Sequence, residues 1–293
     1  MTRSLHRHKG ISAQRMGKSM PRKTSRPRWV HLVRRAVVQS SLAGLLVWTV
    51  SSAQVQTDIT PDSTMGTGVV QFGAVHNIVG GTRPESGQNL FHSFDRFSVG
   101  TGDTARFWHE PGVENIISRV TGHAASMIDG TLQAEVNVFL LNPQGIMFGP
   151  HATLDVNGSF HASTADVLRF ADGAEFSSHL GGQSSLTVAA PSAFGFLHAD
   201  PAGIAIEGSD FEVPEGQTLS IIGGDMTIEG ARLIFFHDPP SLVAPGGQIN
   251  LVSVASRGEV IIDPTGAPSH VGVESFDQFG EIEIVQGSWS DVS

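Results

Sequence analysis

Few side chains that could carry out covalent chemistry are present after residue 53. The last lysine is Lys23, and the chain has no tyrosine or cysteine. This excludes Schiff-base, Ser–Lys, P-loop and thiolate-metal chemistry from that part of the chain. The segment 100–105, Gly-Thr-Gly-Asp-Thr-Ala, has the glycine spacing of a dinucleotide-binding loop. Such a loop must open a helix, and Pro111 follows too soon, so no cofactor is expected.

The histidines that could bind a metal lie singly along the chain. Three of the 13 precede residue 53, and the other ten include no His-Glu-x-x-His motif. His109-Glu110 and His237-Asp238 are adjacent pairs, which we interpret as solvated loop residues rather than ligands. No metal site is therefore expected.

The main enzymatic alternative is a polysaccharide lyase or hydrolase. Such an enzyme needs acidic side chains gathered on one face, with a basic residue or bound calcium in a lyase. The acids here are spread along the chain, and Asp225 and Glu229 on one strand are better explained by solvation of its edge. A non-enzymatic function is favoured, and the lyase or hydrolase is kept as the alternative.

The N-terminus has the three regions of a secretory signal peptide. Eleven of the 18 Lys and Arg lie in residues 1–35, an apolar run occupies residues 42–50, and small residues follow up to Ala53. Cleavage is expected between Ala53 and Gln54. The alternative is a membrane anchor over residues 36–55, but its uninterrupted apolar core is short for a span of about 20 residues.

The chain after the predicted cleavage site is strongly acidic. Seven arginines remain against all 28 Asp and Glu, which gives a net charge of −21. Such a surface repels phosphate backbones and anionic lipids, so nucleic acid is excluded as a partner. Without cysteine, stability must come from a hydrophobic core, and about 240 residues are enough to build one.

Glycine-led strands recur in the second half of the chain. Each is a turn glycine followed by alternating apolar residues, the pattern of a strand with one buried face. Their first apolar residues, spaced by 22, 23, 11 and 22, are Ile204, Met226, Ile249, Val260 and Ile282. This period predicts a solenoid of roughly ten coils. A β-sandwich competes, but it would need more hairpin signals than Asn157-Gly158.

A sharp corner separates two apolar runs within residues 137–164. One run ends at Leu141, the next starts at Ile146, and Asn142-Pro143-Gln144-Gly145 lies between them. Asn first, Pro second and Gly fourth are the preferences of a type I turn. We expect the Asn142 side chain to supply one capping hydrogen bond, and Gly145 to leave the turn without a Cβ clash.

This corner resembles a motif of the two-partner secretion, or haemagglutination activity, domain of filamentous haemagglutinins. The family's Asn-Pro-Asn-Gly box corresponds to Asn142, Pro143, Gln144 and Gly145, followed by Ile146, and Gln144 departs from the usual Asn. A second family segment matches Asn89, Leu90, Phe91, His92, Ser93 and Phe94. A third matches residues 115–122, and the matches run in order from about Ile59 to the C-terminus.

The resemblance implies an all-β fold, a right-handed parallel β-helix with an N-terminal β cap. It divides the chain into a signal peptide (1–53), a two-partner secretion domain (54–200) and continuing β-helix coils (201–293). The implied function is secretion targeting of an adhesin- or haemagglutinin-like exoprotein. POTRA domains of an outer-membrane transporter barrel would recognise the domain in the periplasm of a Gram-negative bacterium and export it to the cell surface.

The exoprotein's final role is a separate question. An adhesin is favoured over a cytolysin or a contact-dependent inhibition toxin, because a toxin would carry a C-terminal payload. Residues 280–293 have the pattern of another coil. We therefore expect the chain to continue beyond Ser293 and to bind there any receptors on host or neighbouring cells.

Overall fold

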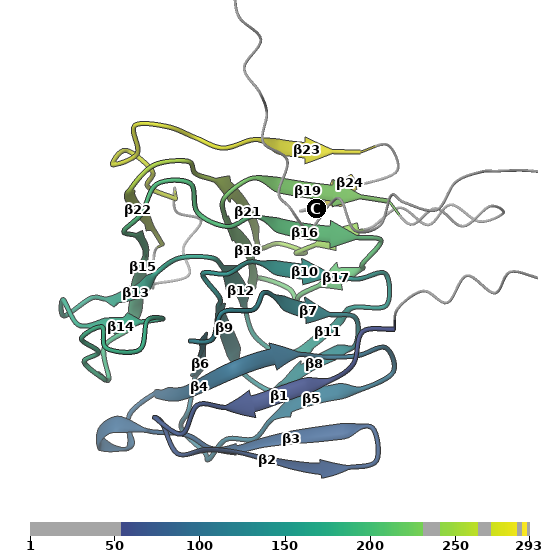
Figure 1. Ribbon diagram of the computed structural model, residues 1–293, viewed down its shortest axis with the longest axis vertical. Coiled ribbons are helices and arrows are strands. Elements are labelled where there is room, and N and C mark those ends of the chain that lie inside the picture. Colours follow the sequence, from purple (N-terminus) through teal and green to yellow (C-terminus); the bar gives the residue numbers. More distant parts are fainter. Residues whose placement is uncertain (1–53, 231–240, 263–270, 286–288, 292–293) are drawn as a thin grey trace, which may run out of the picture. The chain divides into compact units, whose positions relative to one another are not determined.

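The computed structural model describes residues 54–230, 241–262, 271–285 and 289–291 (Figure 1). The predicted signal peptide with Ala53, and the pair His237-Asp238, lie outside these residues. The described part consists of strands and one 3₁₀ turn, η2 (Pro84–Ser86), and it contains no helix long and apolar enough to cross a membrane. Its fold is a right-handed parallel β-helix with an N-terminal β cap, as the resemblance implies.

The first face of the β-helix is a stack of six parallel strands. They are β4 (Asn89–Ser98), β6 (Asn115–Val120), β9 (Asn137–Leu141), β12 (Phe160–Ser163), β18 (Thr218–Gly223) and β21 (Gln248–Ser253). Both sides of this sheet are apolar: Leu140 lies in the core inside the coils, and Phe139 lies in a second core outside them. A strand buried on both faces needs a continuous apolar run, which explains Val138 to Leu141.

Two further faces complete the coils. The second face contains β7 (Ser126–Ile128), β10 (Ile146–Phe148), β16 (Ile204–Glu207), β19 (Met226–Glu229) and β23 (Ile282–Ile284). The third face contains β3 (Val75–Gly80), β5 (Thr104–Phe107), β8 (Thr131–Ala134) and β11 (Thr153–Val156), and then a short sheet of β17 (Phe211–Glu212), β20 (Ser241–Val243) and β24 (Trp289–Asp291). A bridge between Thr153 and Asp210 links its two parts.

Antiparallel strands form the N-terminal cap. Strand β1 (Asp58–Pro61) pairs with β4, and β2 (Thr67–Phe72) forms a hairpin with β3. Strand β2 is the last strand of its sheet, so one of its edges has no partner strand among the described residues. The cap covers the first coil, while the rest of the β-helix continues in parallel ladders (Figure 1).

A small antiparallel sheet lies outside the coils, and we call it the extra-helical sheet. It consists of β13 (Val167–Phe170), β14 (Glu175–Ser177), β15 (Pro191–Phe196) and β22 (Gly258–Ile261). Its Phe176 and Phe194 join Phe91, Phe139 and Leu141 of the first face in the second core. The burial of these side chains holds the extra-helical sheet against the β-helix.

The 22-residue spacing identifies the second face correctly but mixes in strands from elsewhere. Ile204 pairs with Met226, and Met226 with Ile282, so these three stack in register. Ile249 instead lies in β21 of the first face, and Val260 lies in β22 of the extra-helical sheet. The spacing therefore does not say which sheet a strand joins, because a glycine-led alternating run specifies a strand but not its partner.

The described residues form six coils, fewer than the ten expected. Residues 164–203 separate β12 of the first face from β16 of the second face, and they include β13, β14 and β15 of the extra-helical sheet. Strand β22 of the same sheet lies between β21 of the first face and β23 of the second face. Chain length alone therefore overestimates the number of coils. The parallel ladders exclude the competing β-sandwich, whose sheets are antiparallel.

Candidate functional site

The corner expected from the sequence connects β9 to β10. The N–H of Gly145 donates to the carbonyl of Asn142 at 3.1 Å, and the N–H of Gln144 donates to Asn142 Oδ1 at 3.0 Å. Gly145 has φ +113°, a conformation that a residue with a Cβ rarely adopts. The predicted tight turn and the role of its glycine are thus present.

Asn142 does more than cap this turn. Its side chain is fully buried, and Nδ2 donates to the carbonyl of Ala124 and to Ser126 Oγ, each at 3.0 Å. Both acceptors belong to the preceding coil, near the start of β7. The expectation of a single capping hydrogen bond was wrong: the amide makes three, because it lies between stacked coils rather than at a solvated loop tip.

Little of the corner is accessible from outside. Asn142, Gly145 and Ile146 are buried, Pro143 is half-buried and Gln144 is exposed. Ile146 pairs with Ser126 on one side and with Ile204 on the other, which places the corner inside the stack. Gln144 at the apex is therefore the side chain of this motif that a partner could contact on the folded protein.

The second family segment is entirely buried. Its six side chains are at most 5 % exposed and lie in β4: Asn89, Leu90, Phe91, His92, Ser93 and Phe94. Asn89 Oδ1 accepts from Asn115 Nδ2 at 2.9 Å, and Asn115 Oδ1 accepts from Asn137 Nδ2 at 3.0 Å. This asparagine ladder joins the coils of β4, β6 and β9.

The structure does not bring the two predicted motifs into one site. The second segment lies in β4, the corner follows β9, and β6 separates these strands. Each motif instead fixes contacts between neighbouring coils. Both are therefore structural elements of the folded β-helix, apart from the exposed apex.

Arg119 of β6 is a buried cation whose role the sequence analysis missed. Its Nε donates to Ser93 Oγ at 2.7 Å and its Nη2 to Thr64 Oγ1 at 3.2 Å, while Nη1 reaches Ser184 Oγ at 3.0 Å. The guanidinium also lies 4.5 Å from the ring centre of Phe176. It thereby joins the cap, the first face and the extra-helical sheet. Only the scarcity of arginine could have drawn attention to it.

Asp62 accepts hydrogen bonds close to Arg119. Ser93 Oγ donates to it at 2.5 Å, Thr121 Oγ1 at 2.8 Å, and the Thr64 N–H at 2.9 Å. Burial raises the pKa of Asp62, but these hydrogen bonds together outweigh it and hold that pKa below its ordinary value. The carboxylate is thus kept ionised to fix the cap onto β4 and β6.

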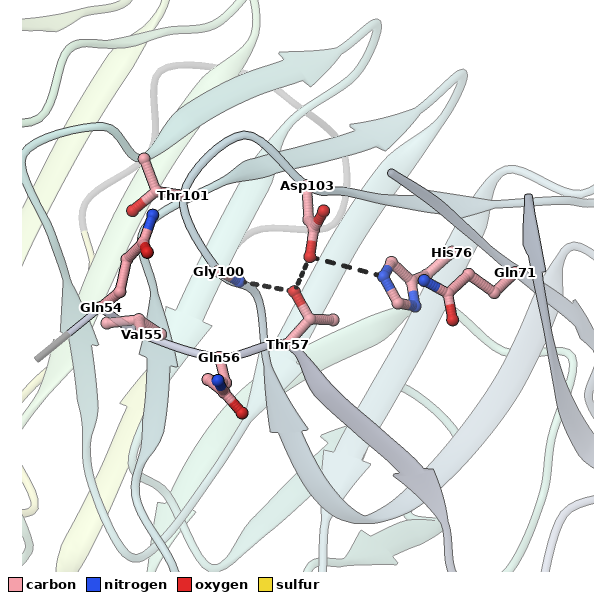
Figure 2. A pocket seen from close by; sticks show the side chains of 9 residues that line it. All are labelled: Gln54, Val55, Gln56, Thr57, Gln71, His76, Gly100, Thr101 and Asp103. Carbon is pink, nitrogen blue, oxygen red and sulfur yellow. Dashed lines mark hydrogen bonds and ion pairs between the residues drawn. The ribbon is translucent and has the colours of Figure 1, made fainter. Parts of the chain in front are cut away.

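A polar pocket of about 340 Å³ lies beside Gln54, the residue that follows the predicted cleavage site (Figure 2). Thr57 Oγ1 donates to Asp103 and accepts from the Gly100 N–H at 2.8 Å, while His76 Nε2 lies 3.6 Å from Asp103 Oδ2. These contacts attach the N-terminal segment at Thr57 to the loop that contains Gly100 and Asp103.

One row of carboxylates fits the lyase or hydrolase alternative. Glu207 and Glu229 are register partners in β16 and β19. Burial, and then the charges of Glu229 and Asp129, raise the pKa of Glu207. Asp225 instead accepts from the N–H of Glu281 at 3.0 Å, as a residue at a strand edge does.

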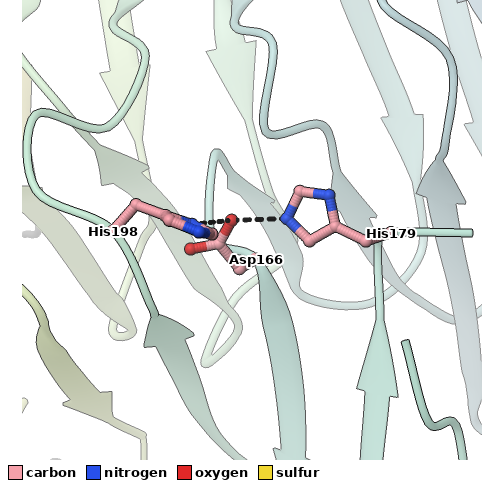
Figure 3. A group of neighbouring side chains, drawn as sticks. All are labelled: Asp166, His179 and His198. Carbon is pink, nitrogen blue, oxygen red and sulfur yellow. Dashed lines mark hydrogen bonds and ion pairs between the residues drawn. The ribbon is translucent and has the colours of Figure 1, made fainter. Parts of the chain in front are cut away.

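Two histidines that are distant in sequence meet at one carboxylate (Figure 3). His179 Nε2 lies 2.7 Å, and His198 Nδ1 3.2 Å, from Asp166 Oδ1. The ligand atoms of these three residues all lie within 4.8 Å of one another. The view that the histidines lie singly was wrong here, because the extra-helical sheet folds separated loops together and no sequence spacing signals it.

Comparisons with known proteins include a family model that matches most of the chain. The model of the TPS secretion domain matches residues 57–293. The heme/hemopexin-binding protein of Haemophilus influenzae is 35 % identical over 82 residues, 28 % of this chain and 9 % of that protein. The chain thus matches only a small part of that curated relative.

Solved structures of secretion domains are also similar. The HMW1 secretion domain from Haemophilus influenzae has a TM-score of 0.46 and 17 % identity, over 78 % of this chain and 50 % of that one. A filamentous hemagglutinin secretion domain has a TM-score of 0.48 and 14 % identity, over 79 % and 75 %. The family model, which spans most of the sequence, is the finding that decides: the chain belongs to the TPS secretion domain family.

Proposed function

We propose that residues 54–293 are the secretion-targeting domain of an exported adhesin- or haemagglutinin-like exoprotein. POTRA domains of an outer-membrane transporter barrel recognise it in the periplasm, and the barrel exports it to the cell surface. The family match over residues 57–293 carries this proposal. The signal peptide over residues 1–53, with cleavage between Ala53 and Gln54, supplies the first step of this route.

The open edge of β2 is the surface we propose for contact with a POTRA domain. The Gly81 N–H donates to the Gly66 carbonyl at 3.2 Å. From this pair onward, hydrogen-bonded and non-hydrogen-bonded residue pairs alternate along the antiparallel hairpin. The N–H groups of Val69 and Gln71 therefore point to the open edge. A strand of a partner could add there by main-chain hydrogen bonds.

Exposed apolar side chains support the same surface. Phe72 of β2 is 70 % exposed and Val70 is 43 % exposed. Main-chain hydrogen bonds supply affinity in such strand addition, and side chains on alternate positions supply specificity. The apex at Gln144 is the second proposed contact.

The test compares secreted with periplasmic protein when the transporter is co-expressed. Gln71→Pro removes an N–H at the open edge and leaves the β2–β3 ladder intact, so secretion is expected to fall by about tenfold. Gln71→Thr changes the same side chain but keeps the N–H, and should be exported like the wild type. Equal secretion of both variants, with equal melting temperatures, would exclude the β2 edge as the contact.

The corner is tested in the same assay. Gln144→Asn restores the usual family box and should be neutral or mildly favourable for secretion. Gln144→Arg places a bulky charge at the exposed apex without touching the buried amide of Asn142, and should lower secretion at unchanged stability. If Gln144→Arg is exported normally, the exposed apex has no part in recognition, and the edge of β2 is left as the proposed contact.

The carboxylate row keeps the polysaccharide lyase or hydrolase as a second candidate. Burial, and then the charge of Glu229, raise the pKa of Glu207, so the pair has the form of a general acid next to a second carboxylate. Purified protein should then release products from anionic glycans, and Glu229→Gln should abolish the release. The absence of turnover by the wild type would remove this candidate and leave the secretion proposal untouched.

A further inference from the structure

We propose that Asp166, His179 and His198 form a binding site for a divalent transition-metal ion of the Zn²⁺ class. This site is independent of secretion targeting. Imidazole nitrogen and carboxylate oxygen are the ligands that Zn²⁺ takes in sites with three protein ligands and one open position. The three side chains come from three loops of the extra-helical sheet and point toward one another (Figure 3).

The carboxylate is positioned to offer one oxygen to an ion. Asp166 Oδ2 accepts from the N–H of Leu197 at 2.6 Å, which leaves Oδ1 facing both rings. Zn²⁺ bonds of roughly 2.0–2.1 Å in a tetrahedral site separate neighbouring ligand atoms by about 3.3 Å. The observed separations from Oδ1 are 2.7 Å and 3.2 Å, and the three ligand atoms lie within 4.8 Å of one another, so rotation of the exposed rings would bring them into these positions.

The backbone holds this carboxylate between the two histidine loops. The Asp166 N–H donates to the Gly195 carbonyl at 3.0 Å, and the Ser178 N–H donates to the Asp166 carbonyl at 2.8 Å. The Asp166 side chain is 10 % exposed, against 43 % for His179 and 67 % for His198. An ion could thus enter from the side of the two accessible rings and bind the buried carboxylate. Its fourth coordination position would be open to water.

Hydrogen bonding alone is the competing explanation of the cluster. Burial raises the pKa of Asp166, and hydrogen bonds from His179, Leu197 and His198 outweigh this and lower the pKa overall. Two imidazoles that donate to one carboxylate would account for that result without a metal. A metal ion can be distinguished from hydrogen bonding by its pH dependence. It binds only to ring nitrogens that carry no proton, so its affinity falls as the pH falls.

The test is a calorimetric titration of the purified exported chain, treated with a chelator, with ZnCl₂. We expect saturable binding of one ion per chain and a melting temperature that rises with Zn²⁺ concentration. His198→Gln and His179→Gln should each weaken binding by about tenfold or more. Both changes are at accessible rings, so the fold is retained. His123→Gln is the control, because His123 is also exposed and lies outside the cluster.

Two outcomes would overturn the site. One is a wild-type chain without saturable one-to-one binding. The other is His198→Gln that binds Zn²⁺ as tightly as His123→Gln does, which would place the bound ion elsewhere. Co²⁺ gives an independent result: a tetrahedral visible spectrum is expected for the wild type and for His123→Gln, and should be lost in His179→Gln.

Discussion

Single buried polar side chains join the coils of this protein. Asn142 ties the corner to the preceding coil, and the ladder of Asn89, Asn115 and Asn137 does the same on the first face. Each amide has a donor and an acceptor, so it can bond to the coil on either side. Removing one leaves buried partners unpaired, which costs more than the bond itself contributes.

Asn142→Ala should therefore destabilise the protein by more than the loss of the single capping hydrogen bond expected from the sequence. Three hydrogen bonds are lost and the buried hydroxyl of Ser126 loses a donor, so we expect a loss of about 2–4 kcal/mol. Gln144→Ala at the exposed apex should stay within about 0.5 kcal/mol of the wild type. Urea unfolding of the two variants measures the difference, and coincident midpoints would show that the inter-coil bonds contribute nothing.

Buried histidines should make stability depend on pH. Burial lowers the pKa of His161 to about 3 and that of His92 to about 4. Both rings stay neutral in the folded chain, while the unfolded chain binds protons below the ordinary value of 6.5. Their contribution to the free energy of unfolding is complete above about pH 6.5. It is lost as the pH falls toward 4, and the loss for His161 is roughly 3 kcal/mol.

His161→Phe tests this contribution. Phenylalanine can retain the stacking on Phe139, and Ser220 Oγ still accepts from Asn250 Nδ2 at 3.1 Å. Denaturant unfolding between pH 4 and 7 should show a shallower loss of stability in the variant. Asp62 and Asp166 have lowered pKa values, so their protonation reduces stability mainly below about pH 4. The loss of stability between pH 4 and 7 therefore reports the histidines. Parallel pH profiles would contradict the assignment to His161.

At the scale of elements, the first face separates two hydrophobic cores and contributes side chains to both. In β9, the side chains of Val138 and Leu140 lie inside the coils, and those of Phe139 and Leu141 pack outside them against the extra-helical sheet. Phe194 of β15 lies 6.3 Å from Phe139 and 6.4 Å from His161, measured between ring centres. Among the described residues, seven of the fifteen buried side chains in the second core are phenylalanines.

Phe194→Ala should loosen the extra-helical sheet selectively. The side chain is fully buried, so its truncation should cost about 3–5 kcal/mol. Amides of β13 and β15 should exchange faster, while those of β6 and β9 stay protected by their coil neighbours. Leu180→Ala, at a side chain 59 % exposed, is the control. Uniform loss of protection in all four strands would mean that the two cores unfold together.

Local patterns were sufficient to predict glycine-led strands, the corner and a solenoid, whereas the right-handed parallel β-helix was implied by the family resemblance. Alternation from Gly280 and Gly224 specifies strands β23 and β19, which each begin two residues after the glycine. The partners of Ile249 and Val260 could not be predicted, because pairing depends on how the chain passes between the coils and the extra-helical sheet. The cluster at Asp166 and the inter-coil bonds of Asn142 follow from that path and from stacking, which leave no spacing in the sequence.

At the scale of the described β-helix, the two ends differ. Strand β1 and the β2–β3 hairpin cover the first coil, whereas β23 at the far edge of the second face exposes Ile282 and Ile284. Phe279 just before it is 57 % exposed. Apolar side chains beside an open strand edge favour association.

Ile284→Lys should therefore reduce self-association of the purified chain. Ile284 is 59 % exposed, so the substitution costs little stability but places a charge beside the open edge. Sedimentation velocity should show concentration-dependent association in the wild type and less in the variant. Leu197→Lys, at an exposed leucine away from β23, should associate like the wild type. A monomeric wild type at all concentrations would contradict the prediction.

The order of pairing has a consequence for movement through a pore. Most coil strands find their partner one coil earlier: Asn115 pairs with Asn89, and Asn137 with Asn115. A chain that emerges N-terminus first can close each coil as soon as it is free, on the template of the one before. In the proposed export, a coil that has closed outside the barrel would oppose backward movement of the chain. The free energy of coil stacking would then drive the crossing in one direction.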